Sequence, residues 1–588
     1  MMKKFKAIIA ATLAAVTCAS VCACGGEKED PTKTYLDVGV FDAGLGTVYF
    51  DEMKKDFEAY YANESFEDGK TGVVLRATKK NTEFNPAQLL TSMKDYQPVL
   101  YLLNTGDYEA FTSAELFTDV TDVMTEKYLD ENGEIAKDTG KTATQSIEDT
   151  MLDGYSDVFK KDDDKYYAVP FMYSAPGIIF DADLFDEQSL YFKADGTVGA
   201  NAADLAAQNC SAGFDGKPGT YDDGLPATWA QFLTLLSAIR NKGLTPFTWA
   251  ESPSTYQISR LFNIIHANYE GYDDYMLNYS LSGTDSELGE INDGNYTKLL
   301  EQEGRKVAIK AFYDITKNTD NYSVKAAPAG GNTHTTAERE FIQSQRYGTR
   351  IAMFVENSYW EQEARSVFDG EPQQEKNGYG KRNFKYMTMP KFEGMGEGIE
   401  DQTSTERVIP TTYSESYMCI SAKNTNKNAE VQTRVAKLFI KFVQQRSQLV
   451  KFTANTGCFR PYNYTIAEEE KQTCTPYTRS ILELIEEGAT VAPNLAISTK
   501  RRQYTGEDGF ELYCAPGNGG IRYDAKCKNI KATDVETMVG FAVEEKFDYV
   551  VVAQDDPLAL GMVDELAKAG IPAFGPDKAA ARIEASKV

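Results

Sequence analysis

Segments with strand character alternate with amphipathic helical segments along most of the 588-residue chain, and this alternation limits the possible folds more than any other feature. Leu36–Val40 is predicted as the first strand, followed by a helix over Tyr49–Tyr61. Val73–Ala77 and Pro98–Leu103 are predicted as the next two strands. Strands that alternate with helices favour an α/β fold.

Polar and glycine residues follow the first and third predicted strands. Asp42 and Gly44 come directly after the first strand, and Asn104 follows the third. In open α/β sheets, ligands bind at the carboxyl ends of the strands. We therefore predict that Asp42, Gly44 and Asn104 contact a ligand.

Residues 1–24 have the composition of a bacterial export signal. Lys3, Lys4 and Lys6 precede an apolar run from Ala7 to Val21, which is short for a membrane span of about 20 residues. The run ends in a segment that resembles a lipobox, in which Cys24 would be acylated and anchor the chain to the membrane. An ordinary cleaved signal is the alternative. The polar residues 25–34 are predicted to be a flexible tether.

Composition argues against several classes of function. The net charge is −27 and no large Lys/Arg block lies beyond the leader, so nucleic-acid binding is not expected. The two histidines, His266 and His334, argue against a His-rich metal site and a Ser-His-Asp hydrolase. The sequence contains no CxxC pair, so a zinc site is not indicated. Cys458 and Cys474 are close enough in sequence to form a disulfide, but free thiols are the preferred expectation.

Several segments in order resemble the family-1 extracellular solute-binding proteins of carbohydrate ABC importers. The segments that carry the resemblance are 165–185, 225–232, 243–250, 350–361, 389–394 and 418–444, and together they place about residues 35–505 in this class. The resemblance implies a two-lobe periplasmic-binding-protein-like α/β fold with a hinge. Lobe one would hold about 35–168 and 386–450, and lobe two about 169–385 and 451–505.

The resemblance also implies a function. A ligand would bind in the cleft between the lobes, which would close on it by a hinge motion. The chain would be a non-catalytic, monomeric receptor anchored to the outer face of the cell membrane. It would bind a sugar or oligosaccharide and deliver it to the permease of an ABC importer, without a cofactor.

A sugar site needs flat aromatic rings beside hydrogen-bonding groups, because a buried hydroxyl left unpaired is costly. Trp360 follows Glu356 and Tyr359 at the end of an apolar segment, and we predict that these three residues bind the sugar, with Trp360 as the stacking platform. Simple core packing of Trp360 is the alternative. Trp249, with Tyr256 nearby, is predicted either to contact the ligand or to pack in the core, and the sequence favours neither alternative. Trp229 is predicted to be structural.

Two further residues are candidates for the cleft. Tyr173 follows Val169-Pro170, where chains of the resembled family pass through the hinge and often touch the ligand. Packing at the hinge is an equally supported alternative for Tyr173. Arg460 would reach a sugar hydroxyl, or would instead form a surface salt bridge.

Two acidic clusters have simpler explanations than catalysis. Asp162–Asp164 is predicted to be a solvated turn. The segment Asp215–Asp223 has the carboxylates and glycines of a calcium loop but lacks the residue order of an EF-hand. A calcium site there is a minor alternative to an ordinary loop.

The last 78 residues strongly resemble another kind of protein, the N-terminal domain of phosphoribosylamine–glycine ligase, a purine-biosynthesis enzyme. The resemblance covers about 511–588 and includes Gly517, Asn518, Gly519 and Gly520 and the run Asp555, Asp556 and Pro557. These loops match family positions near the phosphoribosylamine site. This fragment is expected to be an incomplete Rossmann-like α/β unit, because segment 501–509 stands in place of the first strand.

The two resemblances together suggest a chimera of truncated parts. An ATP-grasp region is expected after the ligase N domain, and the chain stops at Val588 without it, so ligase chemistry is expected to be inactive. Ligase activity defined by this tail is nevertheless the alternative function. A secreted glycan hydrolase is a third possibility, but no pair of facing carboxylates can be singled out.

Overall fold

The computed structural model describes most of the chain. The described residues are 29–42, 44–79, 98–104, 108–113, 115–161, 163–250, 256–327, 331–346, 350–396, 398–412, 414–424, 428–495, 513–517 and 526–585. Residues 1–24, predicted to be an export leader, and the predicted lipidation residue Cys24 among them lie outside the described residues. Within these ranges, no helix combines the length and the apolar character needed to cross a membrane.

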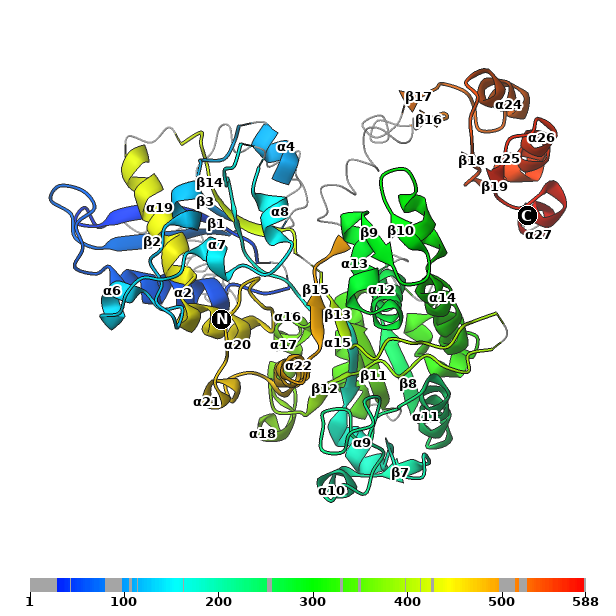
Figure 1. The fold of residues 1–588 in the computed structure, drawn as a ribbon, viewed down its shortest axis with the longest axis horizontal. Coiled ribbons are helices and arrows are strands. Elements are labelled where there is room, and N and C mark those ends of the chain that lie inside the picture. Colours follow the sequence, from blue (N-terminus) through cyan, green and yellow to red (C-terminus); the bar gives the residue numbers. More distant parts are fainter. Residues whose placement is uncertain are drawn as a thin grey trace, which may run out of the picture. The chain divides into compact units, whose positions relative to one another are not determined.

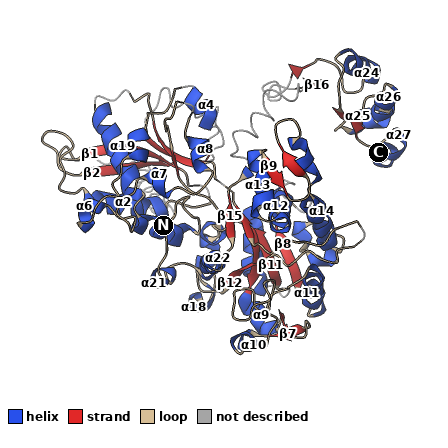
Figure 2. Ribbon diagram, viewed as in Figure 1, coloured by secondary structure: helices blue, strands red, loops and turns tan. Residues whose placement is uncertain are grey.

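The chain divides into two compact units, residues 1–501 and 502–588, and both are mixed α/β (Figure 2). The predicted α/β class is therefore confirmed. The first unit contains two lobes, each with its own sheet and hydrophobic core. In Figure 1 lobe one is mainly blue and cyan, with the yellow helix α19 beside its sheet, and lobe two is mainly green.

Lobe one is built on a five-stranded sheet in the order β2-β1-β3-β14-β4. β1 pairs in parallel with β2 and β3, and β14 runs antiparallel to β3 and β4. The elements are β1 (Thr34–Val40), α2 (Val48–Tyr60), β2 (Val73–Lys79), β3 (Leu100–Asn104), α4 (Tyr108–Ser113), α5 (Thr121–Thr125), α6 (Ala136–Thr139), α7 (Ile147–Thr150), α8 (Tyr155–Phe159), β4 (Val169–Pro170), β14 (Ser416–Ile420), α19 (Ala429–Val443) and α20 (Arg446–Thr456).

The core of lobe one joins segments that are far apart in the sequence. α2 and α19 carry apolar residues at helical spacing, and their buried faces meet where Phe57 packs edge-on against Phe439 at a centroid distance of 5.3 Å. α20 packs against α2 through Phe452, whose ring lies 5.6 Å from Tyr49. The return of α19 and α20 to lobe one therefore completes its core.

Lobe two is built on a four-stranded sheet in the order β12-β5-β11-β8. β8 and β11 are parallel, whereas β5 runs antiparallel to β11 and β12. The elements are β5 (Gly177–Asp181), α9 (Ala182–Gln188), β6 (Tyr191–Phe192), β7 (Val198–Ala200), α10 (Ala202–Ala206), α11 (Trp229–Asn241), β8 (Thr245–Trp249), α12 (Tyr256–Glu270), α13 (Tyr272–Ser280), β9 (Gly283–Asp285), β10 (Gly289–Ile291), α14 (Glu303–Thr316), α15 (His334–Gln343), β11 (Ile351–Glu356), α16 (Trp360–Glu363), α17 (Arg365–Asp369), α18 (Gln374–Asn377), β12 (Phe384–Met387) and α22 (Pro476–Glu486), with four short 3-10 helices, η2 (Tyr296–Glu301), η3 (Thr319–Asn321), η4 (Val324–Ala326) and η5 (Ser344–Arg346).

The chain crosses between the lobes three times: after β4, between β12 and β14, and between α20 and α22. β13 (Val408–Pro410) and β15 (Thr490–Ala492) pair in parallel at the crossings, and α21 (Glu468–Lys471) lies on the last one. Two crossings come later in the chain than the predicted boundaries at 386 and 450. β12 and the buried Phe392 remain with lobe two, and α20 remains with lobe one.

The second unit is small. It contains β16 (Tyr513–Cys514), β17 (Lys526–Cys527), α24 (Val535–Glu544), β18 (Val550–Val551), α25 (Asp555–Leu560), α26 (Met562–Lys568), β19 (Ala573–Phe574) and α27 (Lys578–Ala585). β16 pairs with β17 and β18 with β19, both in parallel. A separate apolar cluster around Leu566 holds the helices to β18 and β19.

Candidate functional site

A large cavity lies where the chain crosses between the two lobes. Its volume is about 1160 Å³, somewhat above the range of about 300–1,000 Å³ that is common for small-molecule sites. Lobe one contributes wall residues from segments 129–134, 150–155 and 444–449, and lobe two contributes Tyr272 and segment 482–493. The crossing segment 459–466 forms the wall between them. The cavity therefore has room for an extended ligand that touches both lobes.

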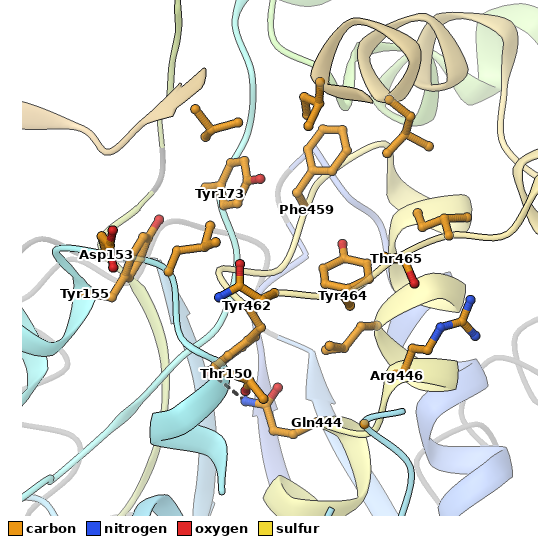
Figure 3. Close-up of a pocket in the computed structure, with 18 of the residues that line it drawn as sticks. Thr150, Asp153, Tyr155, Tyr173, Gln444, Arg446, Phe459, Tyr462, Tyr464 and Thr465 are labelled. Carbon is orange, nitrogen blue, oxygen red and sulfur yellow. Dashed lines mark hydrogen bonds between the residues drawn. The ribbon is translucent and has the colours of Figure 1, made fainter. Parts of the chain in front are cut away.

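Aromatic side chains surround this space (Figure 3). Tyr173 stacks on Phe459 with a centroid distance of 5.5 Å and an interplanar angle of 20°. The other rings of the wall are Tyr155, Tyr272, Tyr462 and Tyr464. The predicted residue Tyr173 thus lines the cavity, and its buried ring also packs at the crossing, whereas its contact with a ligand stays a prediction.

Hydrogen bonds hold two of the rings in place. The Gln444 amide Nε2 donates to the Tyr462 hydroxyl at 2.8 Å, and that hydroxyl donates to the Pro170 carbonyl at 2.5 Å. The Tyr464 and Thr453 hydroxyls lie 2.7 Å apart. These tyrosines consequently offer their ring atoms to the cavity more readily than their hydroxyls.

Other polar groups of the wall are able to meet a polar ligand. Asp153 is solvent-exposed at the entrance to α8, and Thr150 and Asn463 lie on the same wall. Arg446 also lines the cavity, but its Nη1 donates to Glu470 Oε1 at 3.0 Å. The wall therefore combines hydrogen-bonding groups with aromatic rings, as a sugar site requires.

Arg460 does not occupy either position predicted for it. Its side chain is fully buried, and its guanidinium carbon lies 4.7 Å from the Phe171 ring centroid and 5.3 Å from that of Phe452. Its Nη2 donates to Gln444 Oε1 at 3.0 Å. Burial lowers the pKa of Arg460 to about 10. The structure shows neither a surface salt bridge nor an open guanidinium at Arg460, because the side chain is enclosed behind the cavity wall, where it contacts the lining residues Gln444 and Tyr462.

The lobes also touch at two other places. Gly44, in the loop after β1, has φ +71°, and a Cβ there would come within 2.7 Å of Tyr359 Cε2. Elsewhere the Tyr279 hydroxyl of α13 donates to the Gly154 carbonyl at 3.0 Å. The predicted residues Gly44 and Tyr359 are therefore brought together from different lobes, and Asp42 lies half-buried in the same loop.

Glu356 is the last residue of β11, and its side chain is fully buried. Its carboxylate forms an ion pair with Arg260 of α12. Burial and neighbouring carboxylates, including Glu356, raise the pKa values of Glu338 and Glu363. Glu356 Oε1 also accepts a hydrogen bond from the Asn357 amide at 2.9 Å, and its fully buried side chain is not part of the cavity lining.

Trp360 is a core residue, contrary to its predicted role as a stacking platform. Its side chain is 0% exposed. It is enclosed by the rings of Phe341, Phe354, Phe368, Phe384 and Tyr477, at centroid distances of 5.0–6.3 Å. Since no face of the indole is open, the packing alternative stated from the sequence describes Trp360.

The other predicted contacts are dispersed. Trp249 ends β8 as a buried ring 5.1 Å from Tyr322, and Asn104 accepts a hydrogen bond from the Ser416 hydroxyl at 2.7 Å. Tyr256 begins α12, but its side chain lies outside the described part of the chain. Trp229 stacks on Phe232 at 5.0 Å, as its structural role predicts. Neither Trp249 nor Asn104 lines the cavity.

The acidic loop Asp215–Asp223 turns its carboxylates onto its own backbone. Asp222 Oδ2 accepts from the Asp215 amide at 3.0 Å, and Asp223 Oδ2 accepts from the Gly219 amide at 2.7 Å. Among the residues described, no group of three or more His, Cys, Asp and Glu side chains is arranged to hold a metal ion. Calcium binding here remains a sequence-based prediction. Cys458 and Cys474 are both buried thiols, not a disulfide.

The C-terminal part of the chain matches a known protein family. Residues 492–584 match the family model described as Phosphoribosylglycinamide synthetase, N domain. Phosphoribosylamine–glycine ligase of Caldanaerobacter subterraneus is 46% identical over 77 residues, which are 13% of this chain and 18% of that enzyme. The Clostridium acetobutylicum enzyme is 41% identical over 76 residues, again 13% and 18% of the two chains. The chain thus spans less than a fifth of these relatives' length.

Solved structures of sugar-binding proteins align with most of the chain. The apo form of RafE from Streptococcus pneumoniae covers 82% of this chain and 92% of its own, with 15% identity and a TM-score of 0.46. A Streptococcus pneumoniae solute-binding protein in complex with the blood group A-trisaccharide covers 79% and 90%, with 14% identity and a TM-score of 0.43.

The ligase-like positions lie in the second unit. Gly517 has φ +74°, a conformation that favours glycine, whereas Asn518, Gly519 and Gly520 lie outside the described residues. Asp555 and Asp556 are exposed in the first turn of α25, and Pro557 is buried behind them. All seven positions fall inside the matched range 492–584.

The sequence did not single out most of the cavity residues. Tyr155, Tyr272, Tyr462 and Tyr464 come from three segments of the chain that only the crossings bring together. One local signal was available, since Tyr462-Asn463-Tyr464-Thr465 alternates aromatic and polar residues directly after Arg460-Pro461.

Proposed function

We propose that the first unit is a non-catalytic receptor that binds a sugar or oligosaccharide in the cavity between its lobes. The observation that carries this proposal is the combination of size and lining: about 1160 Å³ of space, six aromatic rings, and exposed polar groups contributed by both lobes. Aromatic faces suit the C–H surfaces of sugar rings, and the polar groups can meet the hydroxyls. Because three crossing segments join the lobes, binding would be coupled to a hinge motion.

A thermal-unfolding screen against sugars, amino acids and peptides tests the proposal. A carbohydrate is expected to stabilise the protein by about 2.7 kcal/mol at a free concentration near 100 times its Kd. Micromolar binding would correspond to about −8 kcal/mol. If only a non-carbohydrate raises the melting temperature, the sugar assignment is wrong.

Replacing Tyr272 with alanine is expected to weaken sugar binding roughly fivefold, because one aromatic contact is worth about 1 kcal/mol. Tyr272 is half-buried in the cavity wall, so its removal should leave the melting temperature of the free protein nearly unchanged. The matched control is Tyr313→Ala, which removes a tyrosine that is 59% exposed on α14 and remote from the cavity lining. Isothermal titration should show a loss for Tyr272→Ala alone; equal losses in both variants would place the sugar elsewhere.

We further propose that Cys24 carries a lipid that holds this receptor, as a monomer, on the outer face of the cell membrane, where it delivers its ligand to an ABC permease. The lipobox-like end of the leader supports the anchor. Two or more acyl chains hold a protein stably at a membrane. Metabolic labelling with palmitate is expected in the wild-type protein and lost in Cys24→Ala. Undiminished labelling of the variant would exclude Cys24 as the anchor.

The match to the synthetase N domain favours one alternative, ATP-dependent ligation of glycine to phosphoribosylamine by the second unit. The matched part accounts for only 18% of the length of the ligases. We expect no glycine-dependent release of ADP from the purified chain in the presence of phosphoribosylamine. Turnover above the rate without enzyme would support the alternative.

A further inference from the structure

Two cysteines lie opposite each other in the second unit, on strands that the ligand cavity does not involve. Cys514 in β16 and Cys527 in β17 are register partners in a parallel pair, and the Lys528 amide donates to the Cys514 carbonyl at 2.9 Å. Neighbouring strands lie about 4.8 Å apart. Cα atoms bridged by a disulfide are usually about 4.4–6.8 Å apart, so the backbone separation suits a disulfide.

The two side chains also share one face of the strand pair. The Tyr513 ring packs against Phe541 of α24 and against Phe547, which follows that helix. The Lys526 ammonium lies 5.4 Å from the Tyr513 ring centroid. Tyr513 and Lys526 therefore point to the same face. Because successive strand residues alternate between faces, Cys514 and Cys527 both point to the other face.

The position of the Cys527 sulfur supports this direction. An ideal Cβ at Gly517 would lie only 2.4 Å from Cys527 Sγ and 3.4 Å from the Cys514 carbonyl oxygen. The Cys527 sulfur therefore lies against Gly517, in the segment that directly follows β16. Cys527 is exposed and Cys514 is half-buried, so small molecules can reach the pair. Both residues are thiols in this structure.

We propose that Cys514 and Cys527 are a disulfide-forming site, oxidised by small-molecule disulfides such as glutathione disulfide. One cysteine loses its proton, and its thiolate attacks the small disulfide, forming a mixed disulfide and releasing one thiol. The second cysteine then attacks the protein sulfur of the mixed disulfide and releases the second thiol. Two electrons pass from the cysteines to the oxidant, and the product is one bond between β16 and β17.

The oxidation state of Cys514 and Cys527 would report where the second unit is located. Disulfides persist in oxidising compartments and are kept reduced in the cytosol. The bond would therefore form if the second unit is exported with the first, and would be absent if it remains inside the cell. This inference does not depend on sugar binding.

The test is a peptide map of the full chain after incubation with glutathione disulfide and alkylation of the remaining thiols. Trypsin releases Cys514 in peptide 503–522 and Cys527 in the dipeptide 527–528. We expect these two peptides to be linked, with the mass of two hydrogen atoms lost, and the link to vanish after reduction. Maleimide labelling of both cysteines should fall by about tenfold or more relative to the reduced protein.

Cys210→Ser is the matched control, because Cys210 is another accessible cysteine but lies in the first unit. The 503–522 to 527–528 link should form equally in this variant. In Cys527→Ser, Cys514 should carry glutathione instead. Glutathione adducts on both cysteines of the wild-type chain, or links only to Cys210 or to a second copy, would overturn the proposal.

Discussion

Replacing Trp360 with alanine is expected to lower the free energy of unfolding by about 3–5 kcal/mol, the usual range for removing a large buried aromatic side chain. The indole is fully buried among five aromatic rings from β11, α15, α17, β12 and α22. Its removal would leave a cavity that these rigid elements cannot fill. The loss would be a large part of the stability of an ordinary domain, about 5–15 kcal/mol.

Urea unfolding followed by circular dichroism measures this effect. Trp360→Phe is the matched control, since it keeps a ring in the same space, and we expect it to cost clearly less than the alanine variant. If Trp360→Ala leaves the free energy of unfolding unchanged but weakens sugar binding, Trp360 is a ligand contact, as the sequence predicted, and not a core residue.

The second large effect concerns Glu361, which is buried beside Trp360. Burial raises the pKa of Glu361 to about 7, although nearby Arg479 lowers it in part. In the unfolded chain the pKa of this carboxyl group would be near its usual value of 4.5. The folded state therefore binds the proton more tightly, and this group favours folding most at low pH. Its contribution falls as pH rises from about 4.5 to about 7, by roughly 3 kcal/mol in total.

Urea unfolding at about pH 5 and about pH 8 isolates this contribution when the wild type is compared with Glu361→Gln. The neutral variant should be the more stable of the two at the higher pH, and the difference should shrink at the lower pH. Glu270, whose pKa burial also raises to about 7, changes stability in the same direction in both proteins. The contribution of Glu270 therefore cancels when the wild type is compared with Glu361→Gln. An equal pH dependence of both proteins would mean that Glu361 is already paired or hydrated.

Local pattern predicted the framework of lobe one well. β1 and α2 lie within two residues of their expected bounds, because each has an apolar periodicity that only one kind of secondary structure can bury. The strand-end loop with Gly44 meets Tyr359, in the segment that follows β11, but its predicted contact with a ligand stays a prediction. Boundaries between lobes were less accurate, since helix α20 has the same local character whichever lobe it joins.

Individual site residues were harder to predict. Trp360 and Arg460 stand in segments that mix polar and aromatic residues, which is typical both of a ligand site and of the edge of a core. Only the surrounding chain shows that rings from five elements enclose Trp360, and that Phe171 and Phe452 cover Arg460. Burial depends on distant segments, so periodicity along the chain does not reveal it.

By itself, the amino-acid sequence determined the α/β class and the presence of a ligase-like tail after a larger first part, whereas the export leader stays a prediction. These properties depend on local spacing and on the order of motifs. The tertiary structure alone decided where the cavity lies and which tyrosines line it, and it paired Cys514 with Cys527. Those contacts join residues distant in sequence, and they form only when the chain crosses between lobes or closes a strand pair.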